Sequence, residues 1–210
     1  ATRGCSRRLI KPVPQPKSAI LIPRCGATWL IIASATSPAS SMPMSTAAIP
    51  STSAHEEGVV LRIKAEMERC GYDEITIDPM GNILGRIGSG PHIIALDAHV
   101  DTVDVGNLSN WTVDPFRGDL RDGIVYGRGA CDMKGALASI VYGGKLVKEL
   151  GLARDVTLYV VGSVQEEDCD GLCWQYIIEK DGLRPEAVVI AEPTNLGIYR
   201  GHRGRMEIEV

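Results

Sequence analysis

Residues 93–101 read Ile-Ile-Ala-Leu-Asp-Ala-His-Val-Asp, a short apolar run that ends in a histidine flanked by two aspartates. Such a run is typical of a strand buried inside a parallel or mixed sheet. Two further apolar runs occupy residues 156–164 and 187–191. Segments with the apolar spacing of helices alternate with them, at residues 133–150 and 171–180. Strands that alternate with helices predict an α/β domain, in which a mixed, mostly parallel sheet is flanked by helices.

The chain ahead of this run predicts one more helix and two more strands. Ser53 and Glu56 have the spacing of a helix capping box, and four apolar residues follow at helical spacing. Residues 74–78 and 82–87 predict two strands joined by a turn. In the later helix, Trp174 is interpreted as a core residue rather than a ligand contact.

The composition limits what this domain can do. The chain has 210 residues, 44% of them hydrophobic and 23% charged, which is normal for one soluble domain. A net charge of −4 gives no reason to expect nucleic acid or an anionic membrane as a partner. Six cysteines do not form the dense pattern of a small disulfide scaffold, so reduced thiols in a cytoplasmic protein are expected.

The start of the chain differs in composition from the rest. Residues 1–55 contain no Asp or Glu and six Lys or Arg, whereas the remainder carries 26 acidic and 16 basic residues, a net charge of −10. This start resembles an organelle transit peptide, although a disordered extension or a stretch translated in the wrong frame explains it equally well. We expect residues 1–48 to be a disordered extension without an assigned function and residues 49–199 to belong to the folded domain.

Acidic residues gather where the predicted core strands end. Asp97, His99 and Asp101 close the first run, residues 165–168 (Gln-Glu-Glu-Asp) follow the second, and Glu192 follows the third. In open α/β sheets, binding sites form in the crevice beyond the carboxyl ends of the strands. Carboxylates and a histidine gathered there without matching Lys or Arg need a cation, because unpaired charges in a cleft are costly.

His99 and Asp101 point the same way in an extended segment, where side chains alternate with a period of two. His99 can then bind a metal through one ring nitrogen, while Asp101 orients the imidazole from behind. Taken alone, His-x-Asp is a common tripeptide and favours a surface turn.

The stretch Gly127-Arg-Gly-Ala-Cys-Asp132-Met-Lys-Gly135 is more specific. Two glycines predict a tight turn, after which Asp132 stands at the start of the helix expected from residue 133. An N-cap role would explain Asp132, but not the glycines before it or the Lys-Gly pair after it. Gly129 and Gly135 are suited to close backbone approach around a metal, which makes Asp132 a candidate ligand.

Glu166 and Glu167 can divide the work of metal-assisted hydrolysis. One carboxylate can bind a metal, which lowers the pKa of bound water to about 7. The other can take the proton of the attacking water and pass it to the leaving amine. A solvated acidic turn explains Glu-Glu-Asp in isolation, but not its place after an apolar strand together with two other acidic clusters.

Four motifs together resemble a known family. His99-Val-Asp101, the stretch from Gly127 to Gly135, Glu166-Glu167 and Glu192-Pro193 are similar, in order and spacing, to the metallopeptidase family of acetylornithine deacetylase, succinyl-diaminopimelate desuccinylase, aminoacylase and carboxypeptidase G. The similarity covers residues 49–210. Within this family, the sequence looks closest to the YgeY-type hydrolases linked to selenium metabolism, over residues 165–178 and 199–206. The fold that this resemblance implies is the catalytic domain of a zinc peptidase.

The resemblance implies two zinc ions per full-length subunit, with cobalt or manganese as alternatives. Asp132 would bridge the two ions. His99 and Glu192 would complete one metal site, and Glu167 would serve the other. The peptide bond after Asp132 would be cis.

The resemblance also implies a reaction and its catalytic residues. Glu166 would be the general base and acid, and Asp101 would support His99. The expected reaction is hydrolysis of a C–N amide bond in a small peptide or N-acyl amino acid by metal-activated water. Hydrolysis of a carbamoyl or ureido group remains open, because it uses the same activated water. A non-catalytic, metal-binding relic of the fold is the other alternative, and the presence of Glu166 argues against it.

Two family features have no counterpart in the sequence. The family has a final metal-binding histidine near its C-terminus and an inserted lid domain that mediates dimerisation. Residues 200–210 would be the start of that lid. The resemblance therefore implies a fragment with little activity by itself, taken from a full-length homodimer that acts on a small molecule or short peptide.

Overall fold

The structure, a computed structural model, describes residues 45–195 and 197–201. The predicted extension over residues 1–48 lies outside the described residues except for its last four, which begin with a helical turn whose Ala47 is buried. The expected lid segment over residues 200–210 also lies outside them, apart from its first two residues. The proposed domain boundaries therefore stay predictions.

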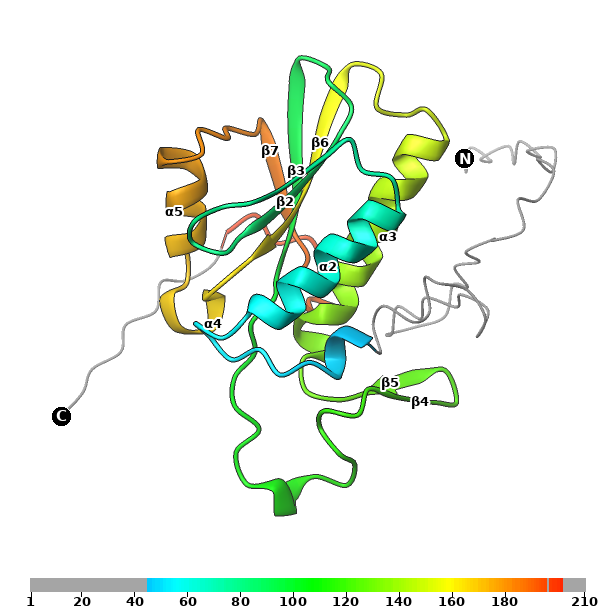
Figure 1. Ribbon diagram of the computed structural model, residues 1–210, viewed down its shortest axis with the longest axis vertical. Coiled ribbons are helices and arrows are strands. Elements are labelled where there is room, and N and C mark those ends of the chain that lie inside the picture. Colours follow the sequence, from blue (N-terminus) through cyan, green and yellow to red (C-terminus); the bar gives the residue numbers. More distant parts are fainter. Residues whose placement is uncertain (1–44, 196, 202–210) are drawn as a thin grey trace, which may run out of the picture.

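A five-stranded mixed sheet forms the centre of the domain, in the order β1-β2-β6-β3-β7 (Figure 1). Strand β3 is parallel to both of its neighbours, β6 and β7, whereas β2 is antiparallel to β1 and β6. Every strand except β2 thus runs in the same direction, which confirms the mixed, mostly parallel sheet. The strands are β1 (Glu74–Ile77), β2 (Ile83–Ile87), β3 (His92–His99), β6 (Val156–Ser163) and β7 (Ala187–Ile190).

Helices cover both faces of this sheet, as predicted. The main helices are α2 (Glu57–Arg69), α3 (Gly135–Glu149) and α5 (Leu172–Glu179). Side chains along each strand alternate between the two faces: Ile83 and Val160 join the core beneath α2 and α3, whereas Leu84 and Val161 join the cluster beneath α5. Within residues 45–195 and 197–201, no helix combines the length and apolar character needed to cross a bilayer.

Helix α2 does not use the predicted capping box. It begins at Glu57, and its N-cap residue Glu56 makes no side-chain hydrogen bond to the helix. Ser53 Oγ instead donates to Asp101 Oδ2 at 2.7 Å, and Glu56 Oε1 accepts from the backbone N–H of Gln165 at 3.0 Å. The capping prediction is wrong because partners distant in the sequence replace the local ones.

The segment between β3 and α3 contains elements that the sequence did not predict. Strands β4 and β5 form a separate hairpin, and they are too short to produce a recognisable strand pattern. Helix α3 begins two residues later than predicted, because the chain at Asp132 and Met133 is not helical. The additional elements are η1 (Leu108–Asn110), β4 (Asp119–Arg121), β5 (Ile124–Tyr126), the kinked turn η2 (Ala130–Lys134) and the helical turn α4 (Glu166–Cys169).

The edge strand β7 is exposed, although its sequence predicts a buried strand. Val188, Val189 and Ile190 are 39%, 55% and 56% exposed. Among the described elements β7 pairs only with β3, and the apolar cluster beneath α5 includes no residue of β7. An apolar sequence predicts that a strand forms, but the elements packed over the strand decide whether it is buried.

Two neighbouring glycines in α3 provide a matched test of how closely this helix packs. A Cβ at Gly144 would overlap Tyr72 Oη and lie 3.0 Å from Ile87 Cδ1, whereas a Cβ at Gly143 would meet nothing within 4 Å. We expect Gly144→Ala to lower the free energy of unfolding by about 1–3 kcal/mol through overpacking. Gly143→Ala should raise it by about 0.5–1 kcal/mol, because glycine is unfavourable inside a helix. Urea unfolding measures both, and equal effects would contradict the close approach of α3 to Tyr72.

Candidate metal centre

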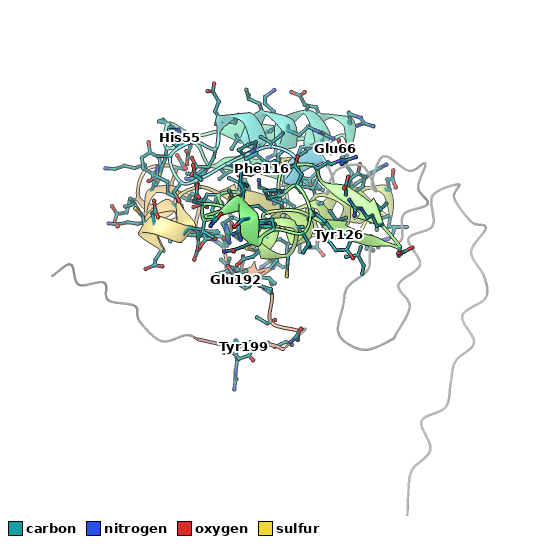
Figure 2. All side chains as sticks on the ribbon, turned by 90° about the horizontal axis from the view of Figure 1, so that it is seen from below. His55, Glu66, Phe116, Tyr126, Glu192 and Tyr199 are labelled. Atoms are coloured by element: carbon teal, nitrogen blue, oxygen red, sulfur yellow. The ribbon has the colours of Figure 1, made fainter. Side chains whose placement is uncertain are left out.

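The carboxyl ends of β3, β6 and β7 meet at one edge of the sheet. His99, the last residue of β3, pairs in register with Ser163 at the end of β6, and Asp97 pairs with Ile190 at the end of β7. The segments that leave β6 and β7 carry the remaining predicted acidic residues, Glu166, Glu167 and Glu192. Beyond β7 the chain leaves the body of the domain, so that Glu192 lies at its margin and Tyr199 lies beyond it (Figure 2).

His99 lies at the centre of the acidic cluster and is only 2% exposed. Its Nε2 atom is 3.0 Å from Asp132 Oδ1, 3.9 Å from Glu166 Oε2 and 4.0 Å from Glu192 Oε1. One potential ligand atom from each of His99, Asp132 and Glu167 lies within 4.8 Å of the other two. The structure therefore brings the four predicted metal ligands and the predicted base together. Their individual roles stay predictions.

Asp132 reaches the cluster because the chain around it departs from helical geometry. Its backbone is extended, with φ −121° and ψ 97°, and its peptide bond to Met133 is cis, as the family resemblance implies. The N-cap of α3 is Lys134, and the helix receives no side-chain cap. The alternative interpretation of Asp132 as an N-cap is thus wrong, and its carboxylate faces His99 instead.

Packing beneath this turn and a positive φ explain why residue 129 is glycine. Gly129 has φ +77°, and a Cβ there would lie 2.7 Å from Thr102 Cγ2 and 3.1 Å from Lys134 Cδ. Lys134 is 1% exposed, and its Nζ donates to the carbonyl of Ile49 at 2.7 Å. Burial lowers the pKa of Lys134 to about 8, opposed by the charge of Asp101. The sequence did not reveal that Lys134 is buried. Its hydrogen bond connects the turn that carries Asp132 to Ile49, ahead of α2.

Asp101 supports the site through more contacts than predicted. His99 Nδ1 lies 2.9 Å from the backbone oxygen of Asp101 and 3.5 Å from its carboxylate Oδ1. The carboxylate also accepts from the hydroxyl of Ser53 and from the backbone N–H groups of Glu166 and Glu167, at 2.7, 3.1 and 3.0 Å. Burial raises the pKa of Asp101, but these hydrogen bonds hold it below its ordinary value. Asp101 therefore connects the glutamate turn to the imidazole.

The electrostatics of the cluster fit a divalent cation. Burial raises the pKa of each of the three glutamates, and neighbouring carboxylates add to the effect while His99 opposes it; the pKa of Glu166 is raised to about 7. Burial lowers the pKa of His99, but hydrogen bonds to two aspartates and the charge of Glu166 outweigh it and raise the pKa to about 11. Mutually repelling carboxylates around one imidazole are a ligand set that zinc accepts.

Asp97 is a buried carboxylate to which the sequence interpretation assigned no role. It is 4% exposed, and its Oδ2 accepts from Trp174 Nε1 at 2.9 Å. Burial raises the pKa of Asp97 to about 6, opposed by the hydrogen bond from Trp174 and by the hydroxyl of Ser163. Trp174 packs beside the core cluster beneath α5, as expected, and also makes this polar contact. The sequence places Asp97 in the first acidic cluster, and its position inside an otherwise apolar strand was the signal that it needs a buried partner.

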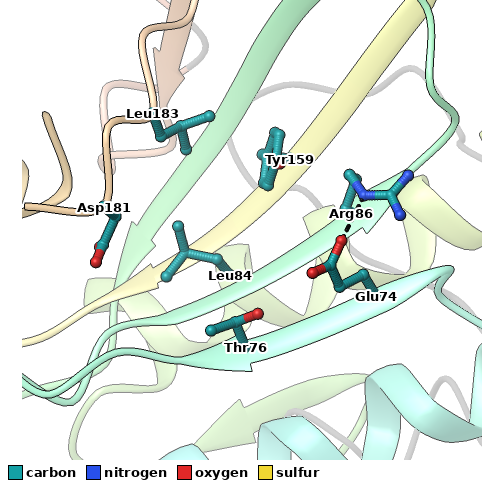
Figure 3. Close-up of a pocket in the computed structure, with 7 residues that line it drawn as sticks. All are labelled: Glu74, Thr76, Leu84, Arg86, Tyr159, Asp181 and Leu183. Atoms are coloured by element: carbon teal, nitrogen blue, oxygen red, sulfur yellow. Dashed lines mark hydrogen bonds and ion pairs between the residues drawn. The ribbon is translucent and has the colours of Figure 1, made fainter.

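A pocket of about 270 Å³ lies away from this cluster (Figure 3). Arg86 Nε donates to Glu74 Oε2 at 2.8 Å along one side of it. Its lining residues are Glu74, Thr76, Leu84, Arg86, Tyr159, Asp181 and Leu183. It includes none of the predicted metal ligands, so it does not mark the predicted site.

Comparison with known proteins places these features in a family. The family model of peptidase family M20/M25/M40 matches residues 95–202. The protein YgeY of Escherichia coli (strain K12) is 59% identical over 163 residues, which cover 78% of this chain and 40% of that protein. A probable succinyl-diaminopimelate desuccinylase of Staphylococcus aureus (strain Mu50) is 39% identical over 134 residues, which cover 61% of this chain and 32% of that protein. The chain thus spans at most 40% of the length of these curated relatives.

A solved structure shows the same fold. The M20 family metallo-carboxypeptidase Sso-CP2 from Sulfolobus solfataricus superposes with a TM-score of 0.65 at 20% identity, over 74% of this chain and 37% of that one. The family match covers more than half of the 210 residues and includes every residue of the cluster from His99 to Glu192. On these grounds the chain belongs to peptidase family M20/M25/M40.

Proposed function

We propose that this chain is the metal-binding part of a hydrolase that cleaves C–N amide bonds in small peptides or N-acyl amino acids. The observation that carries the proposal is the convergence on His99, whose Nε2 lies within 4.0 Å of carboxylate oxygens from Asp132, Glu166 and Glu192. These residues come from three separate segments of the chain. Family membership supports hydrolysis as the reaction.

Four residues of the cluster would hold the metal. As the family resemblance implies, Asp132 would lie between two ions, His99 and Glu192 would complete one site, and Glu167 would serve the other. Imidazole and carboxylate ligands suit zinc, with cobalt and manganese as alternatives. When bound, the ions supply Lewis-acid activation of water and of the scissile carbonyl.

Glu166 is the group that moves the proton. Its Oε2 lies 3.9 Å from His99 Nε2, at the edge of the proposed ligand set. Its carboxylate takes a proton from the attacking water and returns it to the nitrogen of the leaving amine. Asp101 fixes the backbone of Glu166 through the hydrogen bond at 3.1 Å, so the carboxylate starts from a defined position.

Both classes of substrate are proposed because the relatives include both chemistries. One is named a probable desuccinylase and another a metallo-carboxypeptidase. Hydrolysis of either class of substrate breaks an amide C–N bond, and the proposed site would polarise the carbonyl group of that amide. The residues that select the acyl group and the amine are a separate matter, and the four metal ligands do not determine them.

The experiment is a substrate panel on the full-length protein loaded with Zn²⁺, Co²⁺ or Mn²⁺. We expect turnover of N-acyl amino acids or dipeptides that stops with a chelator and returns when the metal is restored. Turnover of carbamoyl or ureido compounds alone would replace the amide assignment. Stoichiometric metal binding without turnover of any substrate would favour the non-catalytic alternative.

A further inference from the structure

Asp97 places a carboxylate inside the sheet, two residues before His99. The two side chains lie on the same face of β3, because side chains alternate along a strand. Asp97 is 4% exposed. Burial of a carboxylate is costly unless hydrogen bonds or opposite charges compensate for the lost water. The position therefore requires specific partners.

The principal partner of Asp97 is the indole of Trp174. The Oδ2 atom accepts from Trp174 Nε1 at 2.9 Å, while Oδ1 is buried and has no hydrogen-bond partner among the described residues. The hydroxyl of Ser163 also favours the charged form of the carboxylate. One directed hydrogen bond thus defines how the side chain is held.

Trp174 connects this carboxylate to the glutamates of the site. It belongs to α5, and the chain runs from α4, which begins with Glu166 and Glu167, directly into α5. Ile177 holds α5 on the sheet by apolar packing. Apolar packing is non-directional, so it keeps α5 against the sheet without fixing the rotation of the helix about its axis. The hydrogen bond from Trp174 to Asp97 fixes that rotation.

Asp97 also joins β3 to the strand that leads to Glu192. In the sheet it lies opposite Val161 of β6 and Ile190 of β7. Its carbonyl accepts from the backbone N–H of Ala191 at 2.9 Å, one residue before Glu192. Asp97 therefore contacts α5 and the strands β6 and β7, which lead to Glu166, Glu167 and Glu192.

We propose that Asp97 is a positioning residue of the metal centre, which holds Glu166 and Glu167 in place relative to His99 through the indole of Trp174. Asp97 acts through Trp174 and touches neither substrate nor metal. The effect of Asp97 on turnover rests on the proposed function. Its effect on Zn²⁺ affinity can be measured without any substrate and does not depend on that function.

The test is a double-mutant cycle in the full-length protein with Asp97→Ala, Trp174→Phe and the double variant. Phenylalanine keeps an aromatic ring in place but has no N–H to donate. Each single substitution should weaken Zn²⁺ binding, measured by calorimetry, by about 10–100-fold, the range typical of residues behind metal ligands. The double variant should bind Zn²⁺ no more weakly than the weaker-binding single variant, because both substitutions remove the same hydrogen bond. In turnover assays kcat should fall while KM stays near that of the parent.

Conservative and matched variants separate positioning from a general loss of structure. Asp97→Asn keeps an oxygen that can accept from the indole, so it should recover part of the affinity lost in Asp97→Ala. Tyr159→Phe removes a hydroxyl beside the same apolar cluster and should change neither Zn²⁺ affinity nor kcat. If Asp97→Ala does not fold, Asp97→Leu, which has a similar shape and no hydrogen-bond acceptor, replaces it in the cycle with Trp174→Phe.

Two results would overturn the role of Asp97. One is additive losses around the cycle. The other is parent-like Zn²⁺ affinity in both single variants with only a lower thermal stability. A parent protein that binds Zn²⁺ but hydrolyses no amide would refute the proposed function alone, and the zinc affinities would still decide the role of Asp97.

Discussion

Glu166→Gln is expected to lower kcat by about 10²–10⁴-fold, the contribution typical of a positioned acid–base group. Glutamine has nearly the same shape as glutamate. Its backbone N–H can still donate the hydrogen bond that Asp101 Oδ1 accepts at 3.1 Å. Its amide cannot take a proton from water or return one to the leaving amine. The set of His99, Asp132 and Glu167 is unchanged, so the bound metal should stay at the parent level.

Kinetics and metal analysis of the same full-length preparation check this expectation. Glu179→Gln is the matched control, because it makes the same chemical change on the exposed surface of α5. That variant should keep the parent kcat. If Glu166→Gln retained activity, Glu166 would not be the proton-transfer group. If it lost its metal together with its activity, Glu166 would be a ligand rather than a base.

Asp132→Asn is expected to remove most of the stabilisation that the protein gains from bound metal. The carboxylate lies 3.0 Å from His99 Nε2 and is the residue proposed to lie between the two ions. At a free metal concentration of 100 times Kd, one bound ion stabilises the folded state by about 2.7 kcal/mol. For a chain of this size that corresponds to a Tm increase of about 5–10 °C in the parent. The variant should show little of it.

Thermal unfolding with and without Zn²⁺ measures this difference. Asp155→Asn is the control, because Asp155 is exposed and precedes β6, at the opposite end of that strand from the cluster. It should respond to Zn²⁺ as the parent does. An equal Zn²⁺-dependent Tm increase in Asp132→Asn would exclude Asp132 as a ligand. Lower stability of the variant in chelator alone would instead indicate a structural contribution of the turn.

The two substitutions separate binding from chemistry. Glu166→Gln should abolish turnover in a protein that still holds metal, whereas Asp132→Asn should lose both. In a protein that binds metal but does not catalyse hydrolysis, Asp132→Asn would still lose the metal, but neither variant could lower a turnover rate. Together the two variants distinguish the hydrolase from the non-catalytic alternative more directly than either one does.

Much of the fold was predictable because its signals are local. Apolar runs at residues 93–98 and 156–164 identify β3 and β6, and their acidic ends identify the edge of the sheet at which a site forms. The convergence of His99 with Glu166 and Glu192 follows from that rule, because parallel strands bring their carboxyl ends to the same edge. The short hairpin of β4 and β5 has no such pattern and was missed.

The supporting contacts were not predictable, because their partners are remote in the sequence. Ser53 has the spacing of a helix cap, yet its hydroxyl donates to Asp101, 48 residues away. Lys134 follows the candidate ligand Asp132 by two residues, yet it reaches back 85 residues to the carbonyl of Ile49. Spacing along the chain carries no information about such pairs.

The amino-acid sequence alone determined the α/β class, the order of the main strands and helices, and the residue types from which a metal site is built, because periodicity and strand ends are properties of a short segment. Only the tertiary structure decided that Asp132 faces His99 instead of capping α3, that β7 is exposed, and that Asp97 and Trp174 are paired. Those outcomes depend on which side chains compete for the same space and the same hydrogen bonds, and that competition exists only once distant segments have come together.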